Sequence, residues 1–438
     1  MMVKAKKSLN DKLSGKALPI VILTVFLDVL GVGMLFPVLP QLIFRIFIPA
    51  GFSYDASLIM LGWLTAIYPL MQFLATPILG QLSDRYGRKP VLAFSLFGTA
   101  IGYALFAMAI ITKNIPLLFF ARGLDGITGG NISVARAVIA DVSPPEKRTQ
   151  NFALIGAAFG FGFVMGPYIG ARLATPGVNF FGLFNTPHWF TTATPFWFTA
   201  ILSIVNTLLV LIILPETNKH INNAMHIAWN KSLTNIKKAV SLPGIRVILS
   251  SEFLFWGGFT FFTTFFQILL IQKLHYKTNN IGDFFAYIGI WIVLTQAILT
   301  PFLAKRFTNR QILRVSILGM GIALFLQLWP TTSRQLLLVA PLIAIFNGLT
   351  LANIGALISL SAGPKIQGEI LGIEASVQSL AQAIPAIIAG YVATFGINVP
   401  VIVGGTIVVI GGLIFIFFYH PHNLEPKAAD AMKAQLSA

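Results

Sequence analysis

Twelve apolar runs, each long enough to cross a lipid bilayer, constrain the fold of this chain more than any other feature. A helix rises about 1.5 Å per residue, so about 20 apolar residues cross ~30 Å of hydrocarbon. Of the 438 residues, 56% are hydrophobic and only 10% are charged, and the mean hydropathy is +0.81. The sequence therefore predicts an all-α, polytopic membrane protein with twelve transmembrane helices. The runs lie at residues 18–43, 57–80, 90–111, 115–140, 151–174, 194–214, 247–271, 281–303, 312–330, 335–360, 370–396 and 399–419.

An internal repeat divides the chain into two pseudo-symmetric halves. Leu82–Leu92 and Leu303–Leu313 are similar in sequence, and each follows the second run of a half. Asp125–Ile132 in the fourth run likewise matches Asn347–Ile354 in the tenth. Such a repeat indicates two parallel six-helix bundles related by an axis along the membrane normal. We expect an N-terminal bundle at 1–218, a cytoplasmic central loop at 219–246, and a C-terminal bundle with a cytoplasmic tail at 247–438.

The formal net charge of +16 comes from basic residues that gather on one side of the predicted membrane. Cytoplasmic loops are enriched in Lys and Arg, so this distribution predicts that both termini are cytoplasmic. The basic excess is thus a topology signal and not a nucleic-acid site. The first run is too long for a cleaved signal peptide, so we expect it to remain as an uncleaved first span. We expect a multi-pass protein of the plasma membrane, which in a bacterium is the inner membrane. Six of the 30 Lys and Arg residues lie on the opposite side: Arg45, Lys113, Arg172, Lys273, Lys277 and Arg334.

Several kinds of chemistry are missing from the sequence. With no cysteine, the chain can form no disulfide and offers no thiolate nucleophile or ligand. No glycine-rich phosphate loop followed by Lys-Ser/Thr is present, which argues against ATP as the energy source. No nucleophile–base pair or His/Glu metal cluster occurs at a workable spacing. We therefore expect no enzyme activity, no metal and no cofactor, and a monomer whose partners are a small-molecule substrate, protons and the lipid bilayer.

The segment Gly80–Leu92, between the second and third runs, carries a cluster of charges and two glycines. An acid and two glycines exceed what a positive-inside anchor requires, although such an anchor is the alternative. The segment resembles the signature loop between the second and third helices of the major facilitator superfamily. That resemblance implies a gating role for Gly80, Asp84, Arg85, Gly87, Arg88 and Lys89.

Asp28 lies within the first run, roughly 16 Å from its start at helical rise. A lone carboxylate in hydrocarbon is costly, so it is either protonated or faces a wet cavity. A group poised between these states suits proton coupling; the alternative is a buried hydrogen bond that serves packing. The surrounding segment resembles the first-helix signature of drug:proton antiporters of the tetracycline-efflux type, through Gly31, Gly33, Pro37 and Pro40.

The fourth run contains a second set of charges. Arg122 lies too deep for easy snorkelling, and Asp125 follows one turn later, where it can pair with Arg122. The resemblance implies a proton-coupling role for this pair; a purely structural ion pair is the alternative. It also implies that Asp141, at the end of the run, pairs with an arginine of the Gly80–Leu92 segment and latches the outward-facing state. We expect Arg85 to be that arginine.

Small residues in the fifth run have the spacing that lets two helices touch closely: Gly162, Gly166, Pro167 and Gly170. They resemble the fifth-helix motif of exporters in the superfamily, and that motif favours antiport over uptake. Generic close packing is the alternative.

The C-terminal half carries less charge. Glu252 is a candidate for a second proton site or a contact for a cation, and the alternative is a shallow acid hydrated from the cytoplasm. The phenylalanine-rich stretch that follows, from Phe253 to Phe266, is expected mainly to face lipid, and the alternative is that it lines an apolar substrate cavity. Arg136 in the fourth run has two equal alternatives: contact with substrate, or a structural role in which it snorkels or pairs with Asp141. The candidates for lining a substrate cavity are Asp28, Asn131, Arg136, Trp256, Gln378 and Gln382.

Together these features predict a secondary transporter that exports a drug-like or amphiphilic molecule in exchange for protons by alternating access. A proton-coupled importer of a nutrient or siderophore on the same scaffold is the alternative. The resemblance to tetracycline-efflux carriers suggests multidrug or tetracycline-like resistance. Those carriers have an acid in the third helix, whereas the aligned position here is Gly102, so other amphiphilic drugs or metabolites stay open as substrates.

Overall fold

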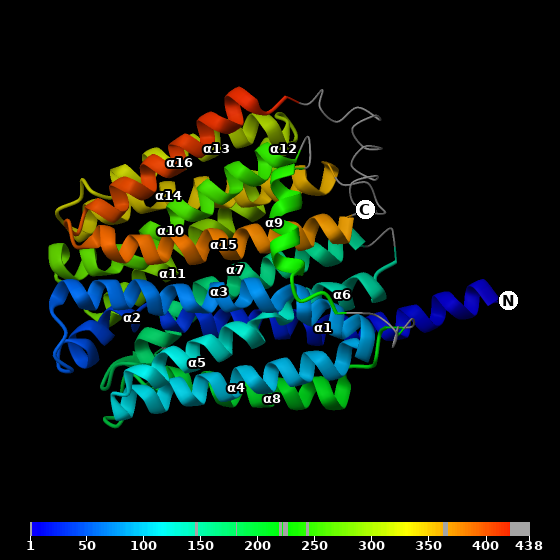
Figure 1. The fold of residues 1–438 in the computed structure, drawn as a ribbon, viewed down its shortest axis with the longest axis horizontal. Helices are drawn as coiled ribbons and strands as arrows, with labels where there is room; N and C mark the ends of the chain where they lie inside the picture. Colours follow the sequence, from blue (N-terminus) through cyan, green and yellow to red (C-terminus); the bar gives the residue numbers. More distant parts are fainter. Residues whose placement is uncertain are drawn as a thin grey trace. The chain divides into compact units, whose positions relative to one another are not determined.

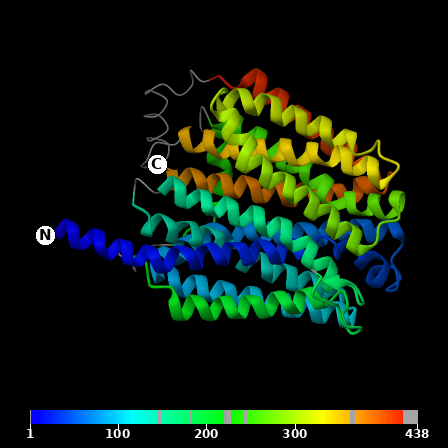
Figure 2. The ribbon, with the colours of Figure 1, turned by 180° about the vertical axis from the view of Figure 1, so that it is seen from behind.

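The computed structural model describes residues 2–144, 148–180, 182–218, 221, 227–241, 245–361 and 367–420, which are mostly helical (Figure 1 and, from behind, Figure 2). The predicted central loop at 219–246 is therefore described only in part, and the tail after residue 420 lies outside the described residues. The helices up to the central loop are α1 (Met2–Leu35), α2 (Leu39–Leu42), α3 (Tyr54–Tyr86), α4 (Arg88–Thr112), α5 (Ile115–Thr128), α6 (Ile132–Val142), α7 (Arg148–Leu173) and α8 (Thr194–Ile213). The later helices are α9 (Lys231–Ser241), α10 (Arg246–Leu274), α11 (Thr278–Leu294), α12 (Thr300–Ala304), α13 (Asn309–Leu326), α14 (Ser333–Ser361), α15 (Gln367–Ala393) and α16 (Val399–Phe418).

The helices account for all twelve predicted spans. Eleven stretches among the described residues are each long and apolar enough to cross a membrane. The remaining span, the fourth, consists of α5 and α6 joined by a 3₁₀ turn at Gly129–Asn131. In the eighth span, a π turn at Thr295–Leu299 joins α11 to α12. The prediction of an all-α protein with twelve transmembrane helices is confirmed, and the strands β1 (Asn179–Phe180) and β2 (Phe184–Asn185) add only a small antiparallel hairpin.

The chain forms two compact units, and the division between them does not fall at the central loop alone. Unit 1 contains residues 1–52, 71–229 and 277–286, and unit 2 contains residues 53–70, 230–276 and 287–438. Residues 53–70 belong to unit 2 because α3 lies directly on α15: a β-carbon on Gly62 would be 2.7 Å from the carbonyl oxygen of Ala386. A β-carbon on Gly282 would be 2.8 Å from the carbonyl oxygen of Pro167, which attaches the start of α11 to unit 1. The two-bundle boundaries stay a prediction.

The aromatic stretch of α10 is buried inside unit 2, so the expectation that it faces lipid is wrong. Phe255, Phe262 and Phe265 are all fully enclosed by protein. Enclosure is possible because α10 approaches α16 at backbone distance: a β-carbon on Gly404 would be 2.5 Å from the carbonyl oxygen of Gly258. A helix that is apolar on every side packs in the interior when neighbouring helices surround it.

Candidate functional site

Asp28 on α1 faces the interruption in the fourth span. The side-chain amide of Asn131 donates a hydrogen bond from Nδ2 to Oδ2 of Asp28 at 2.7 Å. Asn131 is only 1% exposed, whereas Asp28 is partly exposed. The carboxyl group therefore points at a neighbouring helix of unit 1, and it is not completely sealed by protein.

The interruption itself is built by two glycines and by side chains from neighbouring helices. Glycine has a lower helix propensity than every other residue except proline, which favours an interruption at Gly129 and Gly130, and the turn leaves carbonyl groups that need donors. The Ser95 hydroxyl donates to the carbonyl oxygen of Thr128, and Gln72 Nε2 donates to that of Gly129 at 2.9 Å. A β-carbon on Gly130 would lie 3.0 Å from the backbone of Thr76, so α3 crosses the turn at contact distance. These contacts hold Asn131 beside Asp28.

Arg122 and Asp125 form a buried ion pair one turn before the interruption. Arg122 Nη1 lies 2.8 Å from Asp125 Oδ2, and the two side chains are 5% and 4% exposed. The pairing that the sequence predicted is present. Burying either charge alone would be costly, so each group compensates the other.

Gly102 of α4 lies directly against this ion pair. A β-carbon at Gly102 would be 3.2 Å from the β-carbon of Asp125 and 3.4 Å from the carbonyl oxygen of Ala121. Position 102, for which the sequence resemblance implies an acid in the related carriers, therefore lies against a carboxylate-bearing residue of α5. An acid here would place a second negative charge beside Asp125.

The glycines of α7 lie against α1 on the segment that carries Asp28. A β-carbon on Gly162 would be 3.0 Å from the backbone nitrogen of Leu30. One on Gly166 would be 2.7 Å from the carbonyl oxygen of Leu30, and one on Gly170 would be 2.6 Å from the Cα of Met34. The two helices thus touch backbone to backbone over more than two turns, which fixes the position of α1 next to the fourth span.

The charged segment Gly80–Leu92 is almost entirely helical. Helix α3 continues to Tyr86 and α4 begins at Arg88, so Gly87 alone makes the turn. Its backbone φ of +100° is a value that residues other than glycine rarely adopt. The sequence predicted a longer loop because the charges are dense there. At Gly80 a β-carbon would meet only Ser133 Oγ at an ordinary 3.8 Å.

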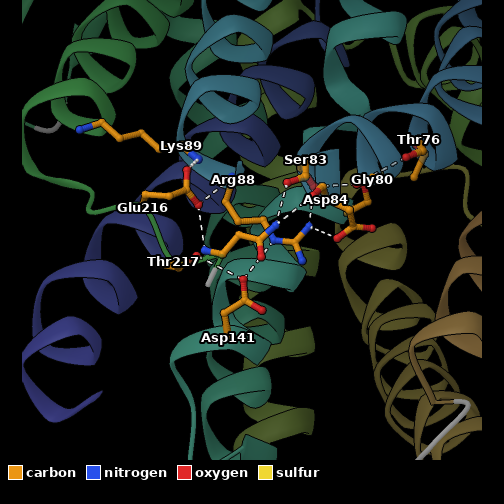
Figure 3. Close-up of polar contacts among 11 residues, drawn as sticks. Thr76, Gly80, Ser83, Asp84, Arg88, Lys89, Asp141, Glu216 and Thr217 are labelled. Carbon is orange, nitrogen blue, oxygen red and sulfur yellow. Dashed lines mark hydrogen bonds and ion pairs between the residues drawn. The ribbon is translucent and has the colours of Figure 1, made fainter. Parts of the chain in front are cut away.

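Arg88, and not Arg85, is the partner of Asp141 (Figure 3). Arg88 Nε donates to Asp141 Oδ2 at 3.0 Å, while Nη1 contacts Asp84 Oδ1 at 2.6 Å and Ser83 Oγ at 2.7 Å. The prediction of Arg85 is wrong because the turn falls at Gly87, which makes Arg88 the first residue of α4. The Arg85 guanidinium instead lies 5.2 Å from the centre of the Tyr86 ring.

Glu216, after α8, completes the cluster and was not predicted as a site residue. Its carboxylate accepts hydrogen bonds from the backbone N–H groups of Arg88 at 2.9 Å and Lys89 at 3.1 Å. The first N–H groups of α4 have no acceptor within the helix, so Glu216 supplies one. A negative charge is also favourable at a helix N-terminus. The neighbouring Thr217 hydroxyl donates to Asp141 Oδ2 at 3.3 Å (Figure 3). The Leu214-Pro-Glu-Thr217 sequence indicates a helix end with an acid beside it, but the backbone partners of Glu216 lie 128 and 127 residues away in the chain.

Comparison with known proteins identifies the family. The sequence pattern of the Major Facilitator Superfamily matches residues 21–308 and 293–437. The chain belongs to the Major Facilitator Superfamily. It is 31% identical over 406 residues to the class E tetracycline resistance protein of Escherichia coli, covering 91% of this chain and 93% of that protein. It is 26% identical over 431 residues to the class H tetracycline resistance protein of Pasteurella multocida, covering 94% and 98%.

Solved structures share the fold of this superfamily member. A D-xylose–proton symporter superposes with a TM-score of 0.74 at 16% identity, over 94% of this chain and 99% of that one. A human organic anion transporter gives a TM-score of 0.71 at 20% identity, over 92% and 99%. At these identities the likeness shows the fold alone. The chain is thus a multi-pass integral membrane protein of a transporter family, and the predicted resemblance to tetracycline-efflux carriers is confirmed.

The remaining predicted residues of this superfamily member are placed as follows. Arg136 on α6 is partly exposed and has no ion-pair partner among the described side chains; Asp141 is engaged by Arg88. Glu252 on α10 is 2% exposed, which does not fit a hydrated acid. Trp256 on α10, with Gln378 and Gln382 on α15, is partly exposed within unit 2. Their proton-coupling or substrate-binding roles stay predictions.

Proposed function

We propose that this chain exports a drug-like or amphiphilic small molecule in exchange for protons by alternating access. The observation that carries the proposal is the setting of Asp28: an intramembrane carboxyl group, partly exposed, whose observed hydrogen-bond partner is the neutral amide of Asn131. Intramembrane acids mark substrate and proton pathways more often than they serve packing. The tetracycline resistance proteins among the relatives support the direction of transport.

The two acids of the N-terminal half have different partners, which suggests different roles. Asp125 is held by the guanidinium of Arg122 in a buried ion pair, so it has a fixed partner of opposite charge. Asp28 has an amide partner, which carries no charge and can bind the carboxyl in either protonation state. Asp28 is therefore our candidate for the group that loads and releases the proton, with Arg122–Asp125 supporting the helix beside it.

The same proposal includes the setting in the cell. The distribution of Lys and Arg supports an orientation with both termini in the cytoplasm of a bacterial inner membrane. The transporter would act as a monomer and draw its energy from the proton gradient, without a bound cofactor. In this orientation the cluster of Arg88, Asp141 and Glu216 lies on the cytoplasmic side, where it could gate access to the cavity.

Everted bacterial membrane vesicles test the proposal. A respiring everted vesicle is acidic inside, so an antiporter should collapse part of this pH gradient when given a substrate and should accumulate that substrate. The probes are tetracycline, ethidium and chloramphenicol. Asp28→Asn should abolish both effects, whereas Asp55→Asn, at an exposed acid in the first turn of α3, should leave them unchanged.

Two outcomes would contradict the proposal. Undiminished proton-coupled transport by Asp28→Asn would remove Asp28 from the coupling mechanism. Uptake of a probe into right-side-out vesicles together with protons, and none into everted vesicles, would instead identify an importer.

A further inference from the structure

Helix α9, in the segment between the two bundles, has one face packed against unit 2. Asn235 Nδ2 donates to Ser376 Oγ at 3.0 Å and to the carbonyl oxygen of Gly372 at 3.3 Å, both on α15. Ser232 and Ala239, on the same side of α9, are also buried. This face is polar or small, which is the reverse of an ordinary surface helix.

The opposite face of α9 is apolar and exposed. Leu233 and Val240 are 64% and 68% exposed, and the exposed Lys237 lies between them at helical spacing. Trp229, two residues before the helix, is 74% exposed. Large apolar side chains held outward on a short helix indicate a surface that something other than water covers.

The charge of the segment identifies the class of partner. Residues 219–246 contain five Lys and Arg residues and no Asp or Glu. A basic helix with an apolar stripe and a nearby tryptophan is typical of segments that lie at the surface of a bilayer containing anionic lipids. A folded acidic protein would complement the charge too, but a membrane is present beside every copy of this chain.

The direction of α9 fits the same partner. Figure 1 shows α9 running crosswise to α10 and α15, which are membrane-spanning helices of the same unit. Because spanning helices run roughly along the membrane normal, a helix that crosses them lies roughly in the membrane plane. Its exposed stripe can then meet the interface along its whole length.

We propose that the exposed face of α9 is a docking surface for the anionic headgroup region of the bilayer. Leu233 and Val240 enter the boundary between headgroups and acyl chains, and Lys237 binds lipid phosphate. Docking at the cytoplasmic leaflet rests on the proposed orientation, whereas contact with lipid does not.

Single-cysteine spin labelling of the full chain tests this proposal, since the sequence contains no cysteine to remove. Leu233→Cys carries the label, and Asn230→Cys, at an exposed polar residue just before α9, is the matched control. Both are reconstituted in vesicles of phosphatidylcholine with about one third phosphatidylglycerol in both leaflets, so the result is independent of insertion direction. Collisions with oxygen, which is enriched in lipid, are compared with collisions with a water-soluble nickel chelate.

The label at 233 should collide mainly with oxygen and be protected from nickel, while the label at 230 stays accessible to nickel. The ratio of labels at 233 that are inserted in lipid to labels that face water should fall in vesicles of phosphatidylcholine alone. In the anionic vesicles, Lys237→Gln should lower the same ratio about fivefold. Equal nickel accessibility at 233 and 230 in anionic vesicles would overturn the proposal and leave a protein partner for this face. Vesicles that contain only lipid and this chain hold no such protein partner, and vesicle transport assays on the same variants separate this result from failure of the proposed export.

Discussion

Arg88 and Asp141 are 53 residues apart in the chain, yet their side chains meet at 3.0 Å between Nε and Oδ2. The contact joins the first residue of α4 to the last turn of α6, and Thr217 donates to the same carboxylate oxygen. The start of α4, the last turn of α6 and the segment that follows α8 therefore meet at one carboxylate of unit 1. Its loss should affect both the stability of this unit and the exchange between transport states.

Asp141→Asn should weaken this junction. The amide oxygen can still accept from Arg88, but the charge-assisted part of the bond is lost, so we expect the free energy of unfolding to fall by about 1–2 kcal/mol. Asp84→Asn is the matched control, because Asp84 touches the same guanidinium but its side chain is 45% exposed, and an exposed pair contributes about 0–1 kcal/mol. Thermal unfolding in detergent measures both variants. An equal loss for Asp84→Asn would show that Asp141 is not the dominant partner.

Glu216→Ala should destabilise the start of α4. The substitution removes the acceptor for the backbone N–H groups of Arg88 and Lys89, at a cost of about 1–3 kcal/mol. Glu216→Gln retains one acceptor oxygen and should lose less than Glu216→Ala. The two variants are compared by thermal unfolding and by hydrogen exchange of the amides at 88 and 89. Unchanged exchange at these amides in Glu216→Ala would contradict the assigned hydrogen bonds.

Gly166→Ala should force α7 away from α1. The new methyl group would lie 2.7 Å from the carbonyl oxygen of Leu30 and 2.8 Å from the Cα of Gly33, and backbone atoms cannot rotate aside. We expect a loss of about 1–3 kcal/mol in stability, together with slower transport, because α1 carries Asp28. Gly156→Ala on the same helix is the control, since a β-carbon there would meet no described atom of another helix within 4 Å. Equal tolerance of both substitutions would mean that the close contact of α7 with α1 is not required.

Gly102→Asp should disturb the Arg122–Asp125 ion pair. A β-carbon at 102 would lie 3.2 Å from that of Asp125, so the added carboxylate competes for the guanidinium of Arg122. Gly102→Asn has almost the same shape without the charge and separates crowding from repulsion. Transport at neutral pH should fall further for Asp than for Asn, by about fivefold or more if the repulsion reaches ~1 kcal/mol. Identical rates for the two variants would assign the whole effect to crowding.

The spans could be predicted from sequence because each needs only a local property, an apolar run of sufficient length. The interruption at Gly129–Asn131 could not, because Gly129 and Gly130 read equally well as small residues for helix packing. Its geometry depends on donors from Ser95 and Gln72 on other helices. The position of Asp28 was predictable, but its hydrogen bond to Asn131 was not.

The errors in the charged cluster have a similar origin. The choice between Arg85 and Arg88 depends on which residue ends α3, and helix boundaries are only weakly specified by sequence. Glu216 was missed because its observed acceptor contacts are with backbone N–H groups, which leave no trace in the pattern of charged residues. The burial of the phenylalanines on α10 followed from the packing of α16 against it, a contact between distant segments.

The turn at Gly87 has a mechanical consequence. Only Gly87 connects α3 to α4, so the connection between the two helices cannot lengthen. The positive φ of Gly87 favours glycine at this position. A backbone displacement of the start of α4 away from Asp141 is therefore passed directly to the end of α3, since the single residue between the two helices cannot absorb it. A distance probe beside Gly87 would therefore report movements of whole helices during the transport cycle, without the local loop fluctuations that a longer connection would add.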